Sequence, residues 1–170
     1  MKSRTGIGNI LGVRIYVLNH ELIMALVLLV GYSGSFSERL GRFSAYALLT
    51  LVHEAGHARF GAICGWKTQA ITLGIFGGLC EFHQDGKEVD DETHDRQDTF
   101  VSWGGVAPEI IILLVAVGLS VSGVWPAGSF FRGVLFVFTW MNAFMIVTNL
   151  LPIRGFDGAT AWRFLRPKPR

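Results

Sequence analysis

Charged residues are scarce in this chain. Only 16% of its 170 residues are Asp, Glu, Lys or Arg, whereas 51% are hydrophobic and the mean hydropathy is +0.42. An ordinary soluble domain carries about 25% charged residues, so this composition argues against one and predicts a single integral membrane domain, residues 1–170. The net charge of +2 is too small, and the basic residues are too scattered, to indicate nucleic acid as a partner.

Cysteine is almost absent. Cys64 and Cys80 are the only two, which is too few for a disulfide framework, and their spacing fits neither a zinc ribbon nor a CxxC redox motif. We therefore expect both to be packing residues. A second metal site of Cys80, His83 and His94 is the alternative, although acidic loops often carry histidines that bind nothing. The GxSxG pattern is missing as well, which argues against a lipase or serine hydrolase.

Long apolar runs, by contrast, are plentiful. A membrane crossing takes about 20 mostly apolar residues, and four stretches qualify: 15–33, 43–62, 102–123 and 131–151. The first follows a basic tail like a signal peptide, but Asn19, His20 and Glu21 interrupt it, so we expect a retained helix. Four crossings place both termini on one side, with 12 of the 15 Lys and Arg residues, which predicts cytoplasmic termini.

The second of these stretches contains a metal-binding pattern, LTLVHEAGHARFGA at 49–62. Residues four apart lie one turn above each other on a helix, so His53 and His57 can reach one ion, with Glu54 beside its open side. Two nitrogen ligands, a third ligand and a carboxylate near the bound water are what a zinc hydrolase needs. A helix with two buried histidines and a surface Glu is the alternative, but ionisable groups inside a bilayer are costly unless they have a task.

Between the second and third stretches lie two segments of different character. Residues 69–82 alternate apolar with small or polar residues up to Gly77 and Gly78, which predicts a strand and turn, whereas residues 83–98 are expected to be a solvated acidic loop. The strand is either part of a simple cytoplasmic hairpin or an edge on which an unwound substrate pairs beside the metal, since such an edge cannot face lipid.

The segment NLLPIRGFDG, residues 149–158, ends the last apolar stretch. Pro152 should stop the helix near Leu151, and Asp157 should start a short final helix. Asp157 either caps that helix or supplies the third, oxygen ligand to the metal. Asn149 either caps a helix end or holds the substrate backbone or the developing oxyanion. The expected fold is an all-α polytopic membrane protein with four crossings, a short re-entrant strand or hairpin near the site and a short C-terminal helix.

Several polar residues of the four stretches share one depth. At 1.5 Å of rise per residue, all of them lie a similar distance from the cytoplasmic face. Such a level suits a water-filled cavity that holds a metal. The residues are Asn19, His20, Glu21, His53, His57, Glu109 and Asn149.

HEAGH in an apolar helix, followed by NLLPIRGFDG near the chain end, resembles the paired HExxH and NxxPxxxxDG patterns of the site-2 proteases, which are intramembrane zinc metalloproteases. GIFGG at 74–78 is similar to their edge-strand motif, and His20 to an early histidine of their N-terminal helix. The resemblance implies that three side chains bind one Zn²⁺ per chain and that Glu54 is the catalytic base. The implied ligands are His53, His57 and Asp157, and the implied auxiliary or substrate-binding residues are Asn149, His20, Gly77 and Gly78.

One region departs from the family pattern. Many relatives have AGPxxN at the start of the third core helix, where this chain has GGVAPE at 104–109, so no role is transferred to Glu109. We also expect no PDZ or cystathionine-β-synthase-type module, for which the chain has no room.

The function implied is cleavage of a membrane-anchored substrate in or near its transmembrane helix, within the lipid bilayer. The expected location is a prokaryotic cell membrane, with the site towards the cytoplasm, and a regulatory membrane partner or a homo-oligomer is possible. A non-proteolytic zinc-binding regulator and a metal transporter are the alternatives.

Overall fold

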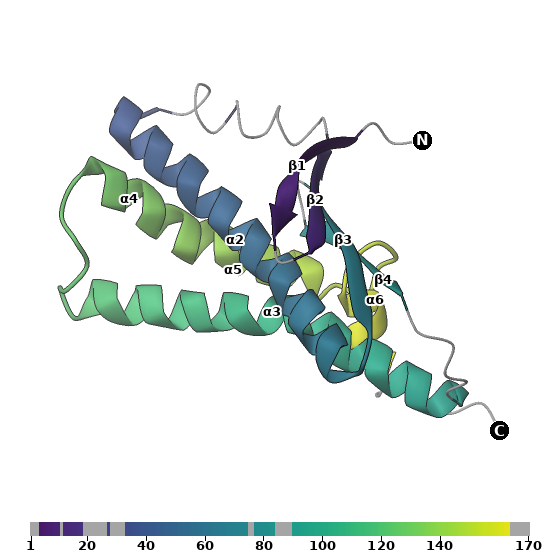
Figure 1. Ribbon diagram of the computed structural model, residues 1–170. Helices are drawn as coiled ribbons and strands as arrows, with labels where there is room; N and C mark the ends of the chain where they lie inside the picture. Colours follow the sequence, from purple (N-terminus) through teal and green to yellow (C-terminus); the bar gives the residue numbers. More distant parts are fainter. Residues whose placement is uncertain are drawn as a thin grey trace.

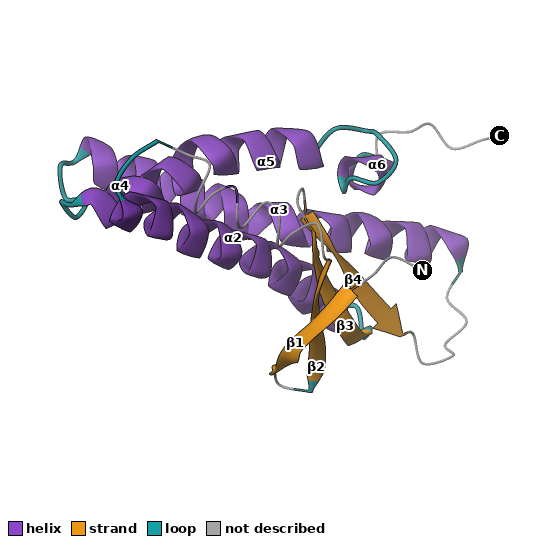
Figure 2. Cartoon of the chain, turned by 90° about the horizontal axis from the view of Figure 1, so that it is seen from above, coloured by secondary structure: helices purple, strands orange, loops and turns teal. Residues whose placement is uncertain are grey.

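The computed structural model describes residues 4–10, 12–18, 27, 33–74, 77–83 and 90–163. Within them, a small sheet lies against a group of long helices (Figure 1) and projects from one side of them (Figure 2). The elements in chain order are β1 (Arg4–Ile10), β2 (Val13–Leu18), α2 (Phe36–Ile63), β3 (Lys67–Gly74), β4 (Gly77–His83), α3 (Asp91–Val121), α4 (Ser129–Phe136), the π-helix η2 (Val137–Met141), α5 (Asn142–Asn149) and α6 (Gly158–Ala161). The chain is mostly helical, but the prediction of an all-α fold is wrong.

The N-terminal hairpin is the largest departure from the expected fold. The first residues of the crossing predicted at 15–33 belong to β2, and most of the others lie outside the described residues. The segment VRIYVL of β2 is rich in β-branched and aromatic residues, which fit a pleated sheet. Gly12, with φ of +86°, lies in the connection from β1. Such a short apolar run cannot be assigned to helix or strand by composition alone.

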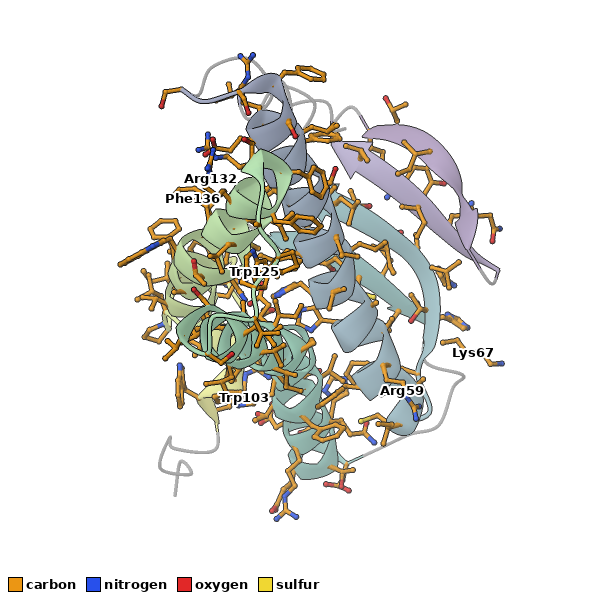
Figure 3. The ribbon with its side chains drawn as sticks, turned by 90° about the vertical axis from the view of Figure 1, so that its left-hand side faces the viewer. Arg59, Lys67, Trp103, Trp125, Arg132 and Phe136 are labelled. Atoms are coloured by element: carbon orange, nitrogen blue, oxygen red, sulfur yellow. The ribbon has the colours of Figure 1, made fainter. Side chains whose placement is uncertain are left out.

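The sheet has the strand order β1-β2-β3-β4. Its outer pairs, β1–β2 and β3–β4, are antiparallel, whereas β2 and β3 are parallel. A parallel pair needs a crossover connection, and α2 lies on that connection. Figure 3 shows α2 between the sheet and the other helices, and it packs against β3 and β4 on one side and against α3 and α4 on the other. The strand predicted over 69–82 is thus present as β3 and β4, but Gly77 and Gly78 begin β4 instead of forming the turn.

Two helical stretches of the described chain are long and apolar enough to cross a membrane, Asp91–Val121 and Ser129–Asn149. They correspond to the crossings predicted at 102–123 and 131–151. The crossing predicted at 43–62 lies within α2, which is helical over 28 residues but does not reach the same hydropathy, because ionisable residues interrupt it. Length and composition therefore support two of the four predicted crossings.

Helix α3 begins earlier than the sequence predicts. Residues 91–98, part of the expected acidic loop, form its first turns. The Asp90 side chain accepts a hydrogen bond from Thr93 N at 2.9 Å, as an N-cap does. Asp91 and Glu92 follow in the first turn, where negative charge is favourable near the positive end of the helix dipole. The acidic residues thus start a helix.

Glycines allow α2 to approach its neighbours closely. A Cβ on Gly56 would overlap the carbonyl oxygen of Gly104 in α3, and one on Gly41 would overlap that of Phe130 in α4. Pro108 has no N–H to bond the Gly104 carbonyl within α3, so this oxygen can face α2. The buried core between α2 and α4–α5 consists of Ala45, Tyr46, Leu49, Val137 and Met145. The close approach of Gly56 to the Gly104 carbonyl sets the distance between α2 and α3.

Candidate metal centre

Three ionisable side chains of α2 are buried where α2 packs against α3. His53, Glu54 and His57 are only 2%, 1% and 7% exposed. One helical turn separates the two histidines, and their Nε2 atoms lie 3.1 Å apart. Among the described residues, these three form a group whose potential ligand atoms all lie within 4.8 Å of one another, so they could hold a metal ion.

Both imidazoles are held at their other ring nitrogen. His57 Nδ1 donates to the backbone oxygen of Val101 in α3 at 2.8 Å. His53 Nδ1 lies 3.1 Å from Oε1 of Glu109, also in α3. The hydrogen bond at His57 Nδ1 selects the tautomer that leaves its Nε2 lone pair free for a metal, and the Glu109 carboxylate, at ion-pair distance from His53 Nδ1, favours the same tautomer of His53. The two Nε2 atoms therefore face the same space.

Asp157 lies opposite the two histidines. Its Oδ2 is 3.2 Å from His53 Nε2, and its Oδ1 is 3.3 Å from His57 Nε2. The side chain makes no capping hydrogen bond to α6, which begins at the next residue, so it does not satisfy the capping interpretation. Burial would raise the pKa of the Asp157 carboxyl, but in the metal-free site imidazoles that carry a proton on Nε2 donate to this carboxylate, outweigh burial and hold its pKa at about 2.

The loop before α6 carries Asp157 back to the histidines. Helix α5 ends at Asn149, three residues before Pro152, close to the predicted end. Trp162 Nε1 donates to Leu150 O at 2.7 Å, which closes the loop on itself. Trp103 of α3, labelled in Figure 3, donates its Nε1 to Ala161 O at 3.2 Å. The first bond closes the loop and the second attaches α6 to α3, so together they position Asp157.

The facing side chains fit a zinc ion. The three contacts among His53 Nε2, His57 Nε2 and the Asp157 carboxylate measure 3.1 to 3.3 Å. Tetrahedral zinc ligands with bonds of about 2.0 to 2.1 Å lie about 3.3 Å from one another. A Cβ on Gly105 of α3 would lie 2.5 Å from His57 Nε2 and 2.6 Å from His53 Nε2. The space beside both nitrogens is thus open because residue 105 has no side chain.

The alternative second metal site has no support in the described residues. Cys80, His83 and His94 are not among the groups that could hold a metal. His94 Nδ1 instead lies 3.5 Å from Asp98 Oδ2, one turn further along α3. Burial raises the pKa of the Cys80 thiol to about 12, which disfavours the thiolate that a metal requires.

Glu54 lies beside the metal ligands with its carboxylate enclosed. Its Oε1 is 4.0 Å from His53 Nε2. Neither carboxylate oxygen has a hydrogen-bond partner within the described chain. The carboxylate rests against β4, since a Cβ on Gly78 would lie 2.6 Å from Glu54 Oε1. A side chain that is free to take up a proton thus lies next to the three potential ligands.

The structure describes Asn149, Gly77 and Gly78 of the predicted auxiliary residues, but not His20. Asn149, the last residue of α5, is 2% exposed, and its Nδ2 has no hydrogen-bond partner among the residues described. Gly77 is the first residue of β4, next to Gly78. His20 lies outside the described residues, so its role stays a prediction.

Three groups that contact the site are not predicted from the sequence: Glu109, Gly105 and the backbone carbonyl of Val101. The sequence places Glu109 among the polar residues of one depth without a role, and a carboxylate within an apolar stretch is the signal that singles it out. Gly105 and the Val101 carbonyl gave no signal, because a missing side chain and a backbone oxygen act here only through the packing of α3 on α2.

The fold is similar to that of the solved site-2 protease from Methanocaldococcus jannaschii. The match has a TM-score of 0.69 and 20% sequence identity, and it covers 96% of this chain and 71% of that one. No protein-family model and no curated protein matches the sequence. At this identity the likeness establishes the fold alone.

Proposed function

We propose that this chain is an intramembrane zinc metalloprotease, which hydrolyses a peptide bond in or near the transmembrane helix of a membrane-anchored substrate. One observation carries the proposal: His53, His57 and Asp157 converge at zinc-ligand separations, beside the unpartnered carboxylate of Glu54. The likeness to a solved site-2 protease in fold agrees with it. Two helices of membrane-crossing length and composition supply the setting.

The chemistry divides between the metal and Glu54. When bound, zinc would lower the pKa of a water molecule to about 7 and polarise the peptide carbonyl. Glu54 would accept the proton of that water and deliver it to the amine nitrogen that leaves. The Asn149 amide, buried and with a free Nδ2, could donate to the carbonyl oxygen as it becomes negative.

The sheet offers a place for the substrate. A transmembrane helix uses its carbonyls in its own hydrogen bonds, so it must unwind before it can be cut. In the described sheet, β4 is the last strand and pairs with β3 alone. Its Gly78 end lies against Glu54. We propose that the unwound substrate pairs along β4 as an added strand, which would bring a peptide bond towards the metal ligands.

The setting of the reaction is also part of the proposal. We propose that the termini and the site face the cytoplasm, the orientation that the distribution of basic residues favours, and that the membrane is that of a prokaryotic cell. The partners would be the membrane protein substrate and the lipid bilayer, with a regulatory membrane protein or a second copy of the chain as a further partner.

Gly78→Ala should impair cleavage without removing the metal. The new methyl group would press on Glu54 and on the backbone oxygen of Thr72, so the carboxylate must move. Displacing a catalytic group by 1 Å costs about 100-fold in rate, and we expect a loss of that order in kcat, measured with a membrane-embedded peptide, at unchanged zinc content.

Gly8→Ala is the matched control, because Gly8 belongs to the same sheet and a Cβ there meets nothing within 4 Å. This control should cleave like the wild type. Equal activity of Gly78→Ala and Gly8→Ala would contradict the proposed place of Glu54.

Removal of the metal is the direct test of the proposal. We expect purified protein in vesicles to lose cleavage of a helical membrane peptide after dialysis against a zinc chelator, and to regain it when about one equivalent of Zn²⁺ is returned. Cleavage that persists in metal-free protein would refute the proposal. A zinc-binding protein that never cleaves would favour the regulator, and zinc flux into the vesicles, unaffected by Glu54→Gln, would favour the transporter.

A further inference from the structure

Glu109 is a buried carboxylate in an apolar helix. It is 0% exposed, and it lies within Asp91–Val121, one of the two stretches apolar enough to cross a membrane. Neither of its carboxylate oxygens makes a hydrogen bond within the described residues, and Oε1 lies at ion-pair distance from His53. An enclosed carboxylate is costly in an apolar surrounding, so stability alone does not account for it.

The Glu109 carboxylate faces one potential metal ligand only. Oε1 lies 3.1 Å from Nδ1 of His53, whose Nε2 faces Asp157. The other histidine, His57, has a neutral partner at Nδ1, the Val101 carbonyl. A carboxylate at Nδ1 holds the ring in place and makes Nε2 a stronger donor to a metal than a carbonyl does. The two histidines are thus supported by partners of different charge.

A further contact holds Glu109 itself. Asn142 Nδ2 donates to the backbone oxygen of Glu109 at 2.9 Å, and Asn142 is 0% exposed. Asn142 is the first residue of α5, directly after the π-helix η2. π-Helical turns are often found at functional sites, since the wider turn changes which residues face the neighbouring helix. A chain of contacts therefore runs from α5 through α3 to the metal-binding helix.

We propose that Glu109 is a positioning residue of the metal centre, whose carboxylate holds the His53 ring so that Nε2 is presented to zinc. This inference rests on the proposed metalloprotease function. It assigns a role at the position where the chain departs from the AGPxxN pattern.

The test is the zinc affinity of Glu109→Gln, measured on purified full-length protein by competition with a coloured chelator. Gln keeps the shape but not the charge, and we expect zinc binding about 10- to 100-fold weaker, the usual effect of losing such a partner. The unfolding temperature of the metal-free variant is measured alongside, because breaking the buried His53–Glu109 contact can itself lower stability. With Co²⁺ in place of zinc, the absorption bands should change, since His53 is no longer held at the same angle.

Met145→Ala is the control, because Met145 is 3% exposed in the core between α2 and α5 and does not belong to the metal centre. It should lower the unfolding temperature and leave zinc affinity and the Co²⁺ bands unchanged. The inference is overturned if Glu109→Gln weakens zinc binding by less than about tenfold, or if Met145→Ala weakens it equally.

If Glu109→Gln does not fold, Glu109→Asp replaces it in the test, because the shorter carboxylate lies further from His53. The same loss of zinc affinity is then expected, with the same comparison to Met145→Ala. Wild-type protein that binds no zinc would refute the proposed function. Wild-type and Glu109→Gln proteins that bind zinc equally would refute the positioning role alone.

Discussion

Glu54→Gln is expected to abolish peptide cleavage while the protein still binds zinc. The amide cannot take up a proton, yet it has nearly the shape of the carboxylate it replaces, so the enclosed site should stay intact. General acid–base catalysis contributes about 100- to 10,000-fold, and we expect a loss in kcat at least that large. The measurement is single-turnover cleavage of a membrane-embedded helical peptide, with zinc content determined on the same sample.

Glu92→Gln is the matched control for this substitution. Glu92 lies in the first turn of α3 and pairs with Arg96 at the surface, where an ion pair contributes little. This variant should cleave at the wild-type rate. A Glu54→Gln protein that still cuts well would rule out Glu54 as the base, and one that loses its zinc would make Glu54 part of the metal-binding structure.

Gly105→Ala should prevent metal binding without changing any ligand. The methyl carbon would lie 2.5 to 2.6 Å from both histidine Nε2 atoms, whereas non-bonded carbon contacts are about 3.5 to 4.0 Å. The methyl group and a metal cannot share this space. We expect zinc affinity to fall by more than the roughly 100-fold that loss of an outer partner costs, together with loss of cleavage, measured by chelator competition and by metal analysis.

Gly118→Ala separates this steric effect from a general effect on α3. Gly118 lies in the same helix, and a Cβ there meets nothing within 4 Å. Ala stabilises a helix interior by about 0.5 to 1 kcal/mol relative to Gly, so Gly118→Ala should be slightly more stable and bind zinc normally. If Gly105→Ala also bound zinc normally, the metal could not lie beside the two Nε2 atoms.

The helices that the sequence predicts best are the last two long ones. Residues 102–123 and 131–151 are apolar over the length of a membrane-crossing helix. Most of the first stretch lies in α3, which begins earlier, and most of the second lies in α4, η2 and α5. The prediction of a helix from residue 15 was wrong because VRIYVL has a composition that suits a strand or a buried helix equally. The predicted start of the third helix was wrong because an acidic run can be either a solvated loop or an N-capped first turn. The cap at Asp90 decides between them.

By itself, the sequence determined which groups could do chemistry. The spacing of His53 and His57 depends only on the pitch of one helix, and Glu54 is their neighbour in the chain. Tertiary structure alone decided what surrounds them. Asp157 lies about a hundred residues away, and its choice between capping α6 and facing the histidines depends on how the final loop is attached to α3.

Glu109 and Gly105 also acquire their places at the metal centre only through the packing of α3 against α2. The carboxylate of Glu109 reaches His53, and the missing side chain of Gly105 leaves room beside both imidazoles. The physical reason is one of range: backbone geometry relates residues within one or two turns, whereas a contact between two helices depends on the side chains of both and on the distance at which they pack.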